Sequence, residues 1–336
     1  MATIKDIAKE LNIGVSTVSM ALNDNERIAP KTKQMVLDKA RELGYIKNGI
    51  AVDLQKQRTN IILFVVTDAS RSLFSKTIHA IQERVAEYHY DLLIATTQNS
   101  PLTAKRFISE HRADGVIVYT NQIEDDFLRA YAREDFPIFV MGHHVDSEHI
   151  YSDPLSAHDS VGYKTLTYLY EKGHRKIAFV KGSMTTLGTP RRLAGYQQGL
   201  MKLGLPYDER LVFDAKENTF EGGYQATLAI LPIIHEIDAI YYANDDIALG
   251  GMRALQQNHI RIPDDISIIG SNDLPESSLV TPALTTMNIH AREGAQFAVD
   301  CLMKAIRKDP YDMAEQMAWK RKNEECVIER DTVKQK

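Results

Sequence analysis

The chain has 336 residues, of which 44% are hydrophobic and 25% are charged, and its net charge is −5. This length allows two or three domains with sizeable cores. The sequence contains no run of about 18 apolar residues and no apolar N-terminal segment, so we expect neither a membrane span nor a secretory signal. Its two cysteines, Cys301 and Cys326, lie outside any C-x-x-C pair, which indicates reduced thiols and a cytoplasmic protein.

The charge is distributed unevenly along the chain. Residues 1–60 contain ten Lys and Arg against seven Asp and Glu, a net charge of +3, so residues 61–336 carry −8. A mildly basic head on an acidic body suits phosphate contact at the head.

The N-terminal stretch has the pattern of two short helices joined by a tight turn. Apolar residues recur at helical spacing over residues 4–11 and again over residues 15–22, and Gly14 tolerates the backbone angles of the turn. Thr3 and Asp6 are spaced as an N-cap and its capping-box partner. Such a pair is compatible with an ordinary helical bundle and with a helix-turn-helix that enters the DNA major groove. The side chains expected to face outward from the second helix are Val15, Ser16, Thr17, Ser19 and Met20.

A third helix is predicted from Pro30, and Gly44 follows it as a helix C-cap should. Residues 45–60 are mainly polar and have the composition of a linker, with at most one or two turns of marginal helix. Segments of this kind often become ordered only on binding. The expected inward face of the third helix consists of Met35, Val36, Ala40 and Leu43.

From residue 61 onward, short apolar runs alternate with amphipathic stretches. This alternation predicts parallel strands covered by helices on both faces. Eight such runs suit either one barrel or two doubly wound domains, and the polar, strand-poor interval 146–160 favours two similar lobes with a cleft between them. The runs are residues 61–66, 91–95, 115–119, 138–141, 176–180, 211–213, 239–243 and 266–270.

Ligands of open α/β sheets bind beyond the carboxyl ends of the strands. An arginine, several amides and carboxylates, and an aromatic ring follow the predicted strands, a set that suits a small polyhydroxylated or heterocyclic ligand. The alternative role for each Asp and Asn is a helix cap or a turn, whereas arginine does not cap, so Arg192 is the strongest candidate. The candidate effector-binding residues are Asp68, Phe74, His143, Arg192, Asn218, Asn244 and Asn272, with Asp245 and Asp273 beside the last two.

Many separate motifs, in the same order, identify the chain as similar to the lactose/galactose repressor (LacI/GalR) family over nearly its whole length. They include TIKDIAKELNIGVSTVSMALN, ARELGY, RRLAGYQQGL, ANDDIALGGMRAL and RIPDDISIIGSND. The resemblance implies an all-α helix-turn-helix DNA-binding head (1–47), a hinge (48–60) and an α/β two-lobed periplasmic-binding-protein-like body of two doubly wound parallel sheets (61–332). It implies a first lobe of about 61–156 and 286–318, and a second of about 157–285 and 319–332.

The resemblance also implies a homodimeric repressor that binds a palindromic operator and responds to a small effector, most simply a sugar. Base-reading positions fall on Val15, Ser16 and Met20, and Met20 stands where Arg is often found. Thr17, Ser19 and Asn23 fall on positions that mainly meet the DNA backbone, and Thr3 belongs to the expected DNA-contact set. In the hinge, Asn48, Ala51 and Leu54 match the family, and Leu54 matches the leucine that wedges into the minor groove.

Several alternatives stay open at this point. Asn272 replaces the Asp usual in the family, so the effector could instead be a purine, a nucleoside or a sugar phosphate. A sugar-binding protein without DNA function would have the same body. No P-loop, H-E-x-x-H, G-x-S-x-G or dinucleotide fingerprint occurs, so we expect no enzyme and no cofactor. His143, His144 and His149 lack a recognised ligand spacing, so we expect no metal. The four residues after Thr332 are too few for a tetramer-forming zipper, so we expect a dimer.

Overall fold

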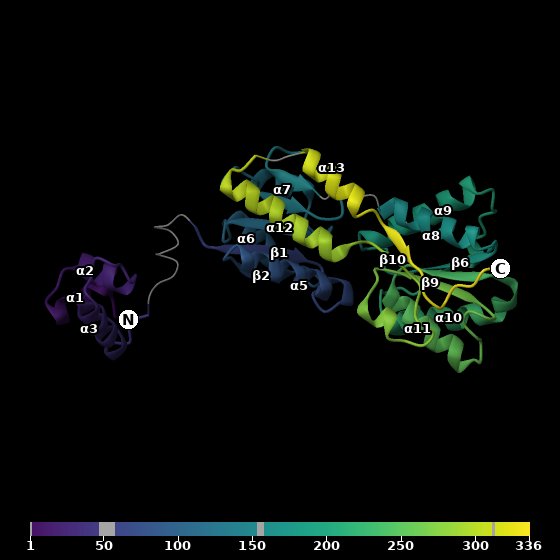
Figure 1. Cartoon of the computed structure of the whole chain (residues 1–336), viewed down its shortest axis with the longest axis horizontal. Coiled ribbons are helices and arrows are strands. Elements are labelled where there is room, and N and C mark those ends of the chain that lie inside the picture. Colours follow the sequence, from purple (N-terminus) through teal and green to yellow (C-terminus); the bar gives the residue numbers. More distant parts are fainter. Residues whose placement is uncertain (1, 47–57, 153–157, 311–312) are drawn as a thin grey trace. The chain divides into compact units, whose positions relative to one another are not determined.

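The computed structural model describes residues 2–46, 58–152, 158–310 and 313–336 (Figure 1). Contacts divide the chain into two units, Met1–Thr59 and Asn60–Lys336, here called the head and the body. Within the described residues, no helix is both long enough and apolar enough to cross a membrane.

The head contains the three predicted helices, which are confirmed within a residue of the expected bounds. The capping box at the first helix forms as predicted: the backbone N–H of Thr3 donates to Asp6 Oδ2 at 2.8 Å, and the N–H of Asp6 donates to Thr3 Oγ1 at 3.4 Å. These hydrogen bonds hold the pKa of Asp6 below its usual range. The helices are α1 (Ile4–Leu11), α2 (Val15–Leu22) and α3 (Pro30–Glu42).

Six small or branched apolar side chains form the centre of the head. One prediction is wrong here, because Met35 is 42% exposed rather than buried. Val36 and Ala40 lie one turn apart and face inward, and Met35 lies about 100° further round the helix axis. Gly44 adopts φ +62°, which confirms the predicted turn at the end of α3. The buried residues are Ile7, Ala8, Val18, Ala21, Val36 and Ala40.

The first sheet of the body is wholly parallel, in the order β2-β1-β3-β4-β5. The interval 146–160 was expected to lack strands, yet it contains the short edge strand β5. The strands are β1 (Ile61–Val66), β2 (Asp91–Thr96), β3 (Gly115–Tyr119), β4 (Ile138–Val140) and β5 (Ile150–Ser152).

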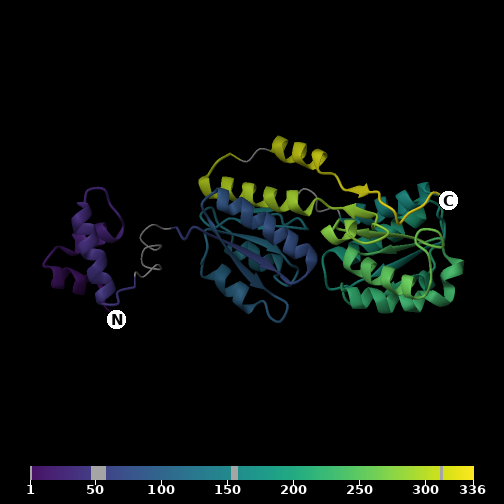
Figure 2. The same ribbon diagram turned by 60° about the horizontal axis from the view of Figure 1, so that its bottom comes forward.

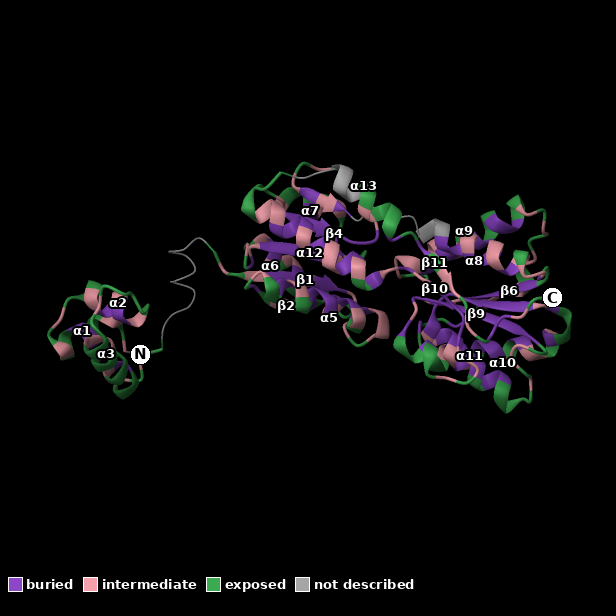
Figure 3. Cartoon of the chain, in the orientation of Figure 1, coloured by how far each residue is buried: buried purple, intermediate pink, exposed green. Residues whose placement is uncertain are grey.

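Helices cover both faces of this sheet, which explains why β1 is one continuous apolar run. Phe64 packs toward α5 (Ser72–Glu87) and α12 (Ala291–Arg307), whereas Val65 packs toward the opposite face. Figure 2 shows α12 running beside α5, and Figure 3 shows the strands between the helices as buried. The opposite face is covered by α6 (Leu102–Ser109) and α7 (Asp125–Tyr131), and α13 (Met313–Lys322) stacks Trp319 on Phe297 of α12 at 4.5 Å.

The second sheet has the order β11-β10-β9-β8-β6-β7. All its described pairs are parallel except β10 with β11, so the expectation of a wholly parallel sheet fails at this edge. The chain returns from α12 and α13 and adds its last strand in the reverse direction. The strands are β6 (Ile177–Lys181), β7 (Val212–Asp214), β8 (Ala239–Tyr242), β9 (Ser267–Ser271), β10 (Thr286–Asn288) and β11 (Cys326–Ile328).

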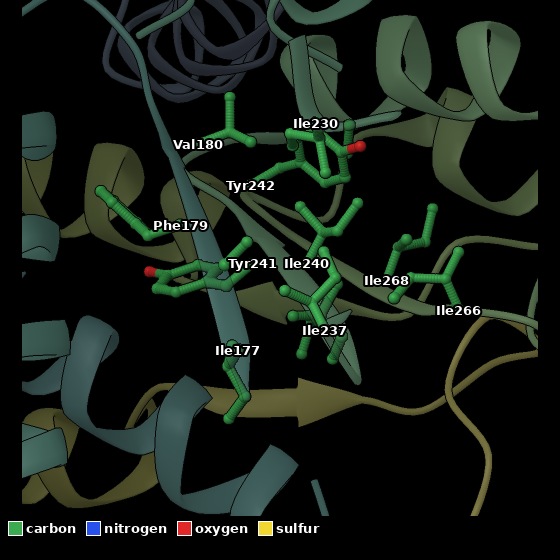
Figure 4. Packing of buried hydrophobic residues seen from close by; sticks show 14 of the residues in the cluster. Ile177, Phe179, Val180, Ile230, Ile237, Ile240, Tyr241, Tyr242, Ile266 and Ile268 are labelled. Atoms are coloured by element: carbon green, nitrogen blue, oxygen red, sulfur yellow. The ribbon is translucent and has the colours of Figure 1, made fainter. Parts of the chain in front are cut away.

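Alternate residues of the central strands reach the two helical layers of the second lobe (Figure 4). Phe179 packs on Tyr241 at 4.9 Å and on Tyr196 of α9 at 5.1 Å. On the opposite face, the hydroxyl of Tyr242 lies 2.9 Å from Thr227 Oγ1 of α10. The two layers consist of α8 (His158–Glu171) with α9 (Gly188–Lys202), and of α10 (Phe220–Ile230) with α11 (Asp245–Gln257).

The chain passes between the lobes more than once near its C-terminus. β10 lies in the second sheet, α12 packs on the first, and β11 returns to the second. Residues 286–288 therefore lie with the second sheet, a few positions beyond the crossing expected at about 286. This repeated crossing places a narrow connection beside the cleft between the lobes.

Candidate functional site

The helix-turn-helix presents one compact set of small side chains on α2. Val15 and Ser16 are exposed, and Val15 is 40% exposed although it is apolar. Gly14 provides no side-chain cap, so the first backbone N–H groups of α2 have no side-chain acceptor there. Around this N-terminus, Thr17, Ser19 and Met20 are partly buried, and Asn23 and the capping residue Thr3 are exposed.

Ion pairs neutralise part of the positive charge of the head. Lys33 pairs with Asp24 at 2.6 Å and Lys39 with Glu42 at 2.6 Å. In residues 2–46, the cations without such a partner are Lys5, Lys9, Arg27 and Lys31. The hinge positions Asn48, Ala51 and Leu54 lie outside the described residues.

A cavity lies between the two lobes of the body, at the carboxyl ends of the strands. Its inner part has a volume of about 60 Å³, and an outer opening of about 490 Å³ adjoins it. Both parts share Thr67, Arg71, Thr186, Asn218 and Asp246. The inner part is lined by Thr67, Arg71, Leu73, Phe74, Tyr119, Thr186, Leu187, Gly188, Thr189, Arg192, Asn218, Asn244, Asp246 and Asn272.

Five of the seven predicted effector residues line this inner cavity: Phe74, Arg192, Asn218, Asn244 and Asn272. The structure does not bring the other two residues to it. Asp68 lies at the outer opening, where its Oδ1 accepts hydrogen bonds from the N–H and hydroxyl of Ser70. His143 lines neither part, because the loop after β4 directs it toward α7, where its Nε2 lies 2.9 Å from Asp125 Oδ1.

Arg192 is the most deeply placed cation of the cavity, with 5% exposure. Its Nη1 donates to the carbonyl oxygen of Ala243, and its Nη2 donates to Asn272 Oδ1 at 2.7 Å. The buried Nε has no hydrogen-bond partner. A buried donor without an acceptor is costly, so this group is available to a ligand.

The two other predicted amides act as caps and as lining residues at once. Asn244 Oδ1 accepts from the N–H of Ile247 at 2.9 Å and so caps α11. Asn218 Oδ1 accepts from the N–H of Ser183 at 3.1 Å. The alternative role of each is therefore real, and it holds the amide in a fixed orientation at the cavity wall.

Sequence reasoning missed Arg71, Tyr119 and Asp246. Tyr119 meets Phe74 edge to face, with ring centroids 5.4 Å apart. Asp246 lines the cavity, whereas its neighbour Asp245 is fully buried and accepts from Thr286, Leu274 and Ser277. The phase of α11 turns successive residues by about 100°, which a sequence list of strand-following residues does not show.

Four hydrogen bonds join the lobes around the cavity. The hydroxyl of Ser72 donates to Asp246 Oδ1 at 2.7 Å, and Lys76 Nζ donates to the carbonyl of Asp273 at 3.0 Å. Asn121 Nδ2 donates to the carbonyl of Thr185 at 2.8 Å, and Arg191 donates to that of Gly142. The two lobes are thus held together in a closed arrangement.

No group of three His, Cys, Asp or Glu that could hold a metal ion occurs in the described part of the chain. The cavity instead combines a guanidinium, amides, hydroxyls and aromatic rings, which suits binding of a small polar molecule rather than covalent chemistry. A helix-turn-helix head with such a body defines the class of ligand-binding transcriptional regulators.

Comparison with known proteins agrees with this class. Residues 3–48 match the family described as bacterial regulatory proteins, lacI family, and residues 166–333 match a periplasmic binding protein-like domain. A transcriptional repressor named PurR from Mannheimia succiniciproducens is 30% identical, over 86% of this chain and 87% of its own. The chain belongs to the LacI family of helix-turn-helix transcriptional regulators.

Two solved structures show the same fold. The Lac repressor dimer bound to operator and the anti-inducer ONPF has a TM-score of 0.73 and 22% identity, covering 99% of both chains. A CelR–cellobiose complex has a TM-score of 0.67 and 20% identity, covering 99% of this chain and all of that one. The protein is a DNA-binding transcriptional repressor with a ligand-binding domain and is not an enzyme; operator and small-molecule binding are typical of its family.

Proposed function

We propose that this repressor binds a palindromic operator as a homodimer in the cytoplasm and is controlled by a sugar-like effector held between its lobes. The single observation that carries the effector site is Arg192, which is buried at the cavity wall with an unpaired Nε. Hydroxyl and amide side chains around it suit a polyhydroxylated molecule. The cellobiose complex and the operator-bound dimer among the structural relatives support the same assignment.

The DNA-contact roles belong to this proposal. Val15, Ser16 and Met20 read base edges in the major groove, with apolar contact to thymine methyl groups replacing part of the usual hydrogen-bond readout. Thr3, Thr17, Ser19 and Asn23 meet the DNA backbone. Asn48, Ala51 and Leu54 act in the hinge, within a head of residues 1–47, a hinge of 48–60 and a body of 61–332.

Control would act through the angle between the lobes. A ligand shifts such an equilibrium only by binding one arrangement better than the other. Arg192, Asn244 and Asn272 belong to the second lobe and Phe74 to the first, so a ligand that touches both sides changes the free energy of closure.

In vitro selection of random duplexes by the full-length protein tests the DNA half of the proposal. We expect enriched inverted repeats and, by sedimentation, two chains per duplex. Failure to enrich any inverted repeat at low salt would refute it. The effector half is tested by screening sugars for a change in operator affinity: the Arg192→Ala variant should lose the response to any active sugar, and an unaltered response in that variant would remove Arg192 from the site.

A further inference from the structure

The inner cavity has an unusual charge balance. Its charged lining residues are Arg71, Arg192 and Asp246, so two guanidinium groups face one carboxylate. Every other residue that lines the inner part is neutral. A buried charge is normally paired, so the partner of each guanidinium matters.

Asp246 is the counter-ion of Arg71. It attracts the Arg71 guanidinium, and its Oδ1 already accepts from the hydroxyl of Ser72 at 2.7 Å. Burial lowers the pKa of Arg71 and raises that of Asp246, and each of the two groups opposes the shift of the other. The charge of Arg192 is left without compensation.

Arg192 forms no ion pair in the part of the chain that the structure describes. Its two described hydrogen bonds go to a backbone carbonyl and to the neutral amide of Asn272, and its Nε has no acceptor. Elsewhere the chain pairs its half-buried arginines with aspartates: Arg330 with Asp273 at 2.6 Å and Arg84 with Asp300 at 2.7 Å. The most buried guanidinium of the cavity thus has an amide where the others have a carboxylate.

We infer that the effector carries an anionic group, a carboxylate or a phosphate, that binds Arg192 and supplies the missing charge. This inference rests on the proposed effector site between the lobes. The inner part, of about 60 Å³, suits a group of a few heavy atoms. The wider outer opening offers Ser70, Gln98, Gln122, Ser183 and Thr185 to hydroxyl groups. The effector class is therefore a sugar acid or a sugar phosphate.

Titration calorimetry on the full-length protein tests this, at one ionic strength set with chloride. The probes are glucose, glucuronate, glucose 6-phosphate, galactose, galacturonate and inorganic phosphate. We expect at least one anion to bind about 10-fold or more tightly than its neutral counterpart, the gain from one charge-assisted hydrogen bond or more. The ranking of acids against phosphates then identifies the group. Tighter binding of a neutral sugar than of its anionic counterparts would overturn the inference, as would the absence of any anion binding at millimolar concentrations.

The Asn272→Asp variant gives a second, independent measurement. It places a carboxylate at the Arg192 guanidinium, so anion affinity should fall about 10-fold or more while the thermal midpoint without ligand stays equal or rises. The matched control is Asn258→Asp, which adds the same charge at the exposed far end of α11 and should leave anion affinity unchanged. Equal anion affinity in Asn272→Asp and wild type would contradict the inference.

Operator binding is read separately in these experiments. A protein that binds anions through Arg192 but selects no operator contradicts the proposed function alone. A protein that selects an operator but releases it only with neutral sugars contradicts this inference alone.

Discussion

A single methyl group at Gly162 should separate two helices that position the cavity. A Cβ built on Gly162 of α8 would lie 2.3 Å from the carbonyl oxygen of Arg192 and 2.9 Å from the backbone nitrogen of Tyr196 on α9. Both neighbours are backbone atoms, so no side-chain rotation relieves the clash. Moving the oxygen from 2.3 to 3.0 Å, the shortest distance that real Cβ atoms show, requires a shift of about 0.7 Å between α8 and α9.

Two opposing effects decide the size of the change in stability. Replacing Gly by Ala inside a helix gains about 1 kcal/mol from helix propensity. Overpacking of a tight core contact costs about 1–3 kcal/mol, and here the upper end applies because backbone must move. We therefore expect Gly162→Ala to lower the free energy of unfolding by about 2 kcal/mol.

Urea unfolding followed by circular dichroism measures this difference, provided that the slope of the transition is unchanged. The matched control is Gly199→Ala at the same helix pair, where the new Cβ would lie 2.6 Å from Cδ2 of Leu166. That side chain can rotate away, so the control should remain close to wild type. The reasoning is refuted if Gly162→Ala is as stable as wild type, or if both variants lose the same stability.

Three further predictions concern the head and a buried carboxylate. Ile7→Ala, at a fully buried site, should cost about 2–5 kcal/mol and abolish operator binding while ligand binding by the body persists; retained operator affinity would contradict this. Met20→Arg should enrich guanine in selected operators by bidentate contact, and an unchanged consensus would argue against a base-reading role. Burial raises the pKa of Asp245 to about 6, so its contribution to stability is full below pH 4 and is lost as pH rises toward 6; Asp245→Asn should remove that slope from urea midpoints, and an identical slope would refute it.

Local patterns in the sequence predicted most of the framework. The spacing of apolar residues over α1 and α2 and the continuous run of β1 each reflect a period imposed by the backbone itself. Caps and turns such as Thr3 with Asp6, and Gly44 at φ +62°, are local as well. These features need no knowledge of the remaining chain.

Short strands were not recoverable in this way. The strands β5, β10 and β11 have three residues each, too few to show a periodic pattern. Their hydrogen bonds come from distant partners: β11 pairs with β10 across the whole of α12 and α13. The antiparallel edge of the second sheet therefore depends on how the chain returns from the first lobe.

The candidate site divides along the same line. The sequence alone pointed to Arg192, because an arginine after a strand has no role as a cap, and to Asn272, which replaces an aspartate of the family. Only the tertiary structure showed that the two residues, 80 positions apart, share a hydrogen bond with no carboxylate in the described residues to balance the guanidinium. It also turned His143 toward α7 and placed Asp246, rather than Asp245, at the cavity. Helix phase, strand order and lobe closure decide which side chains meet, and these are properties of the packed chain rather than of any local segment.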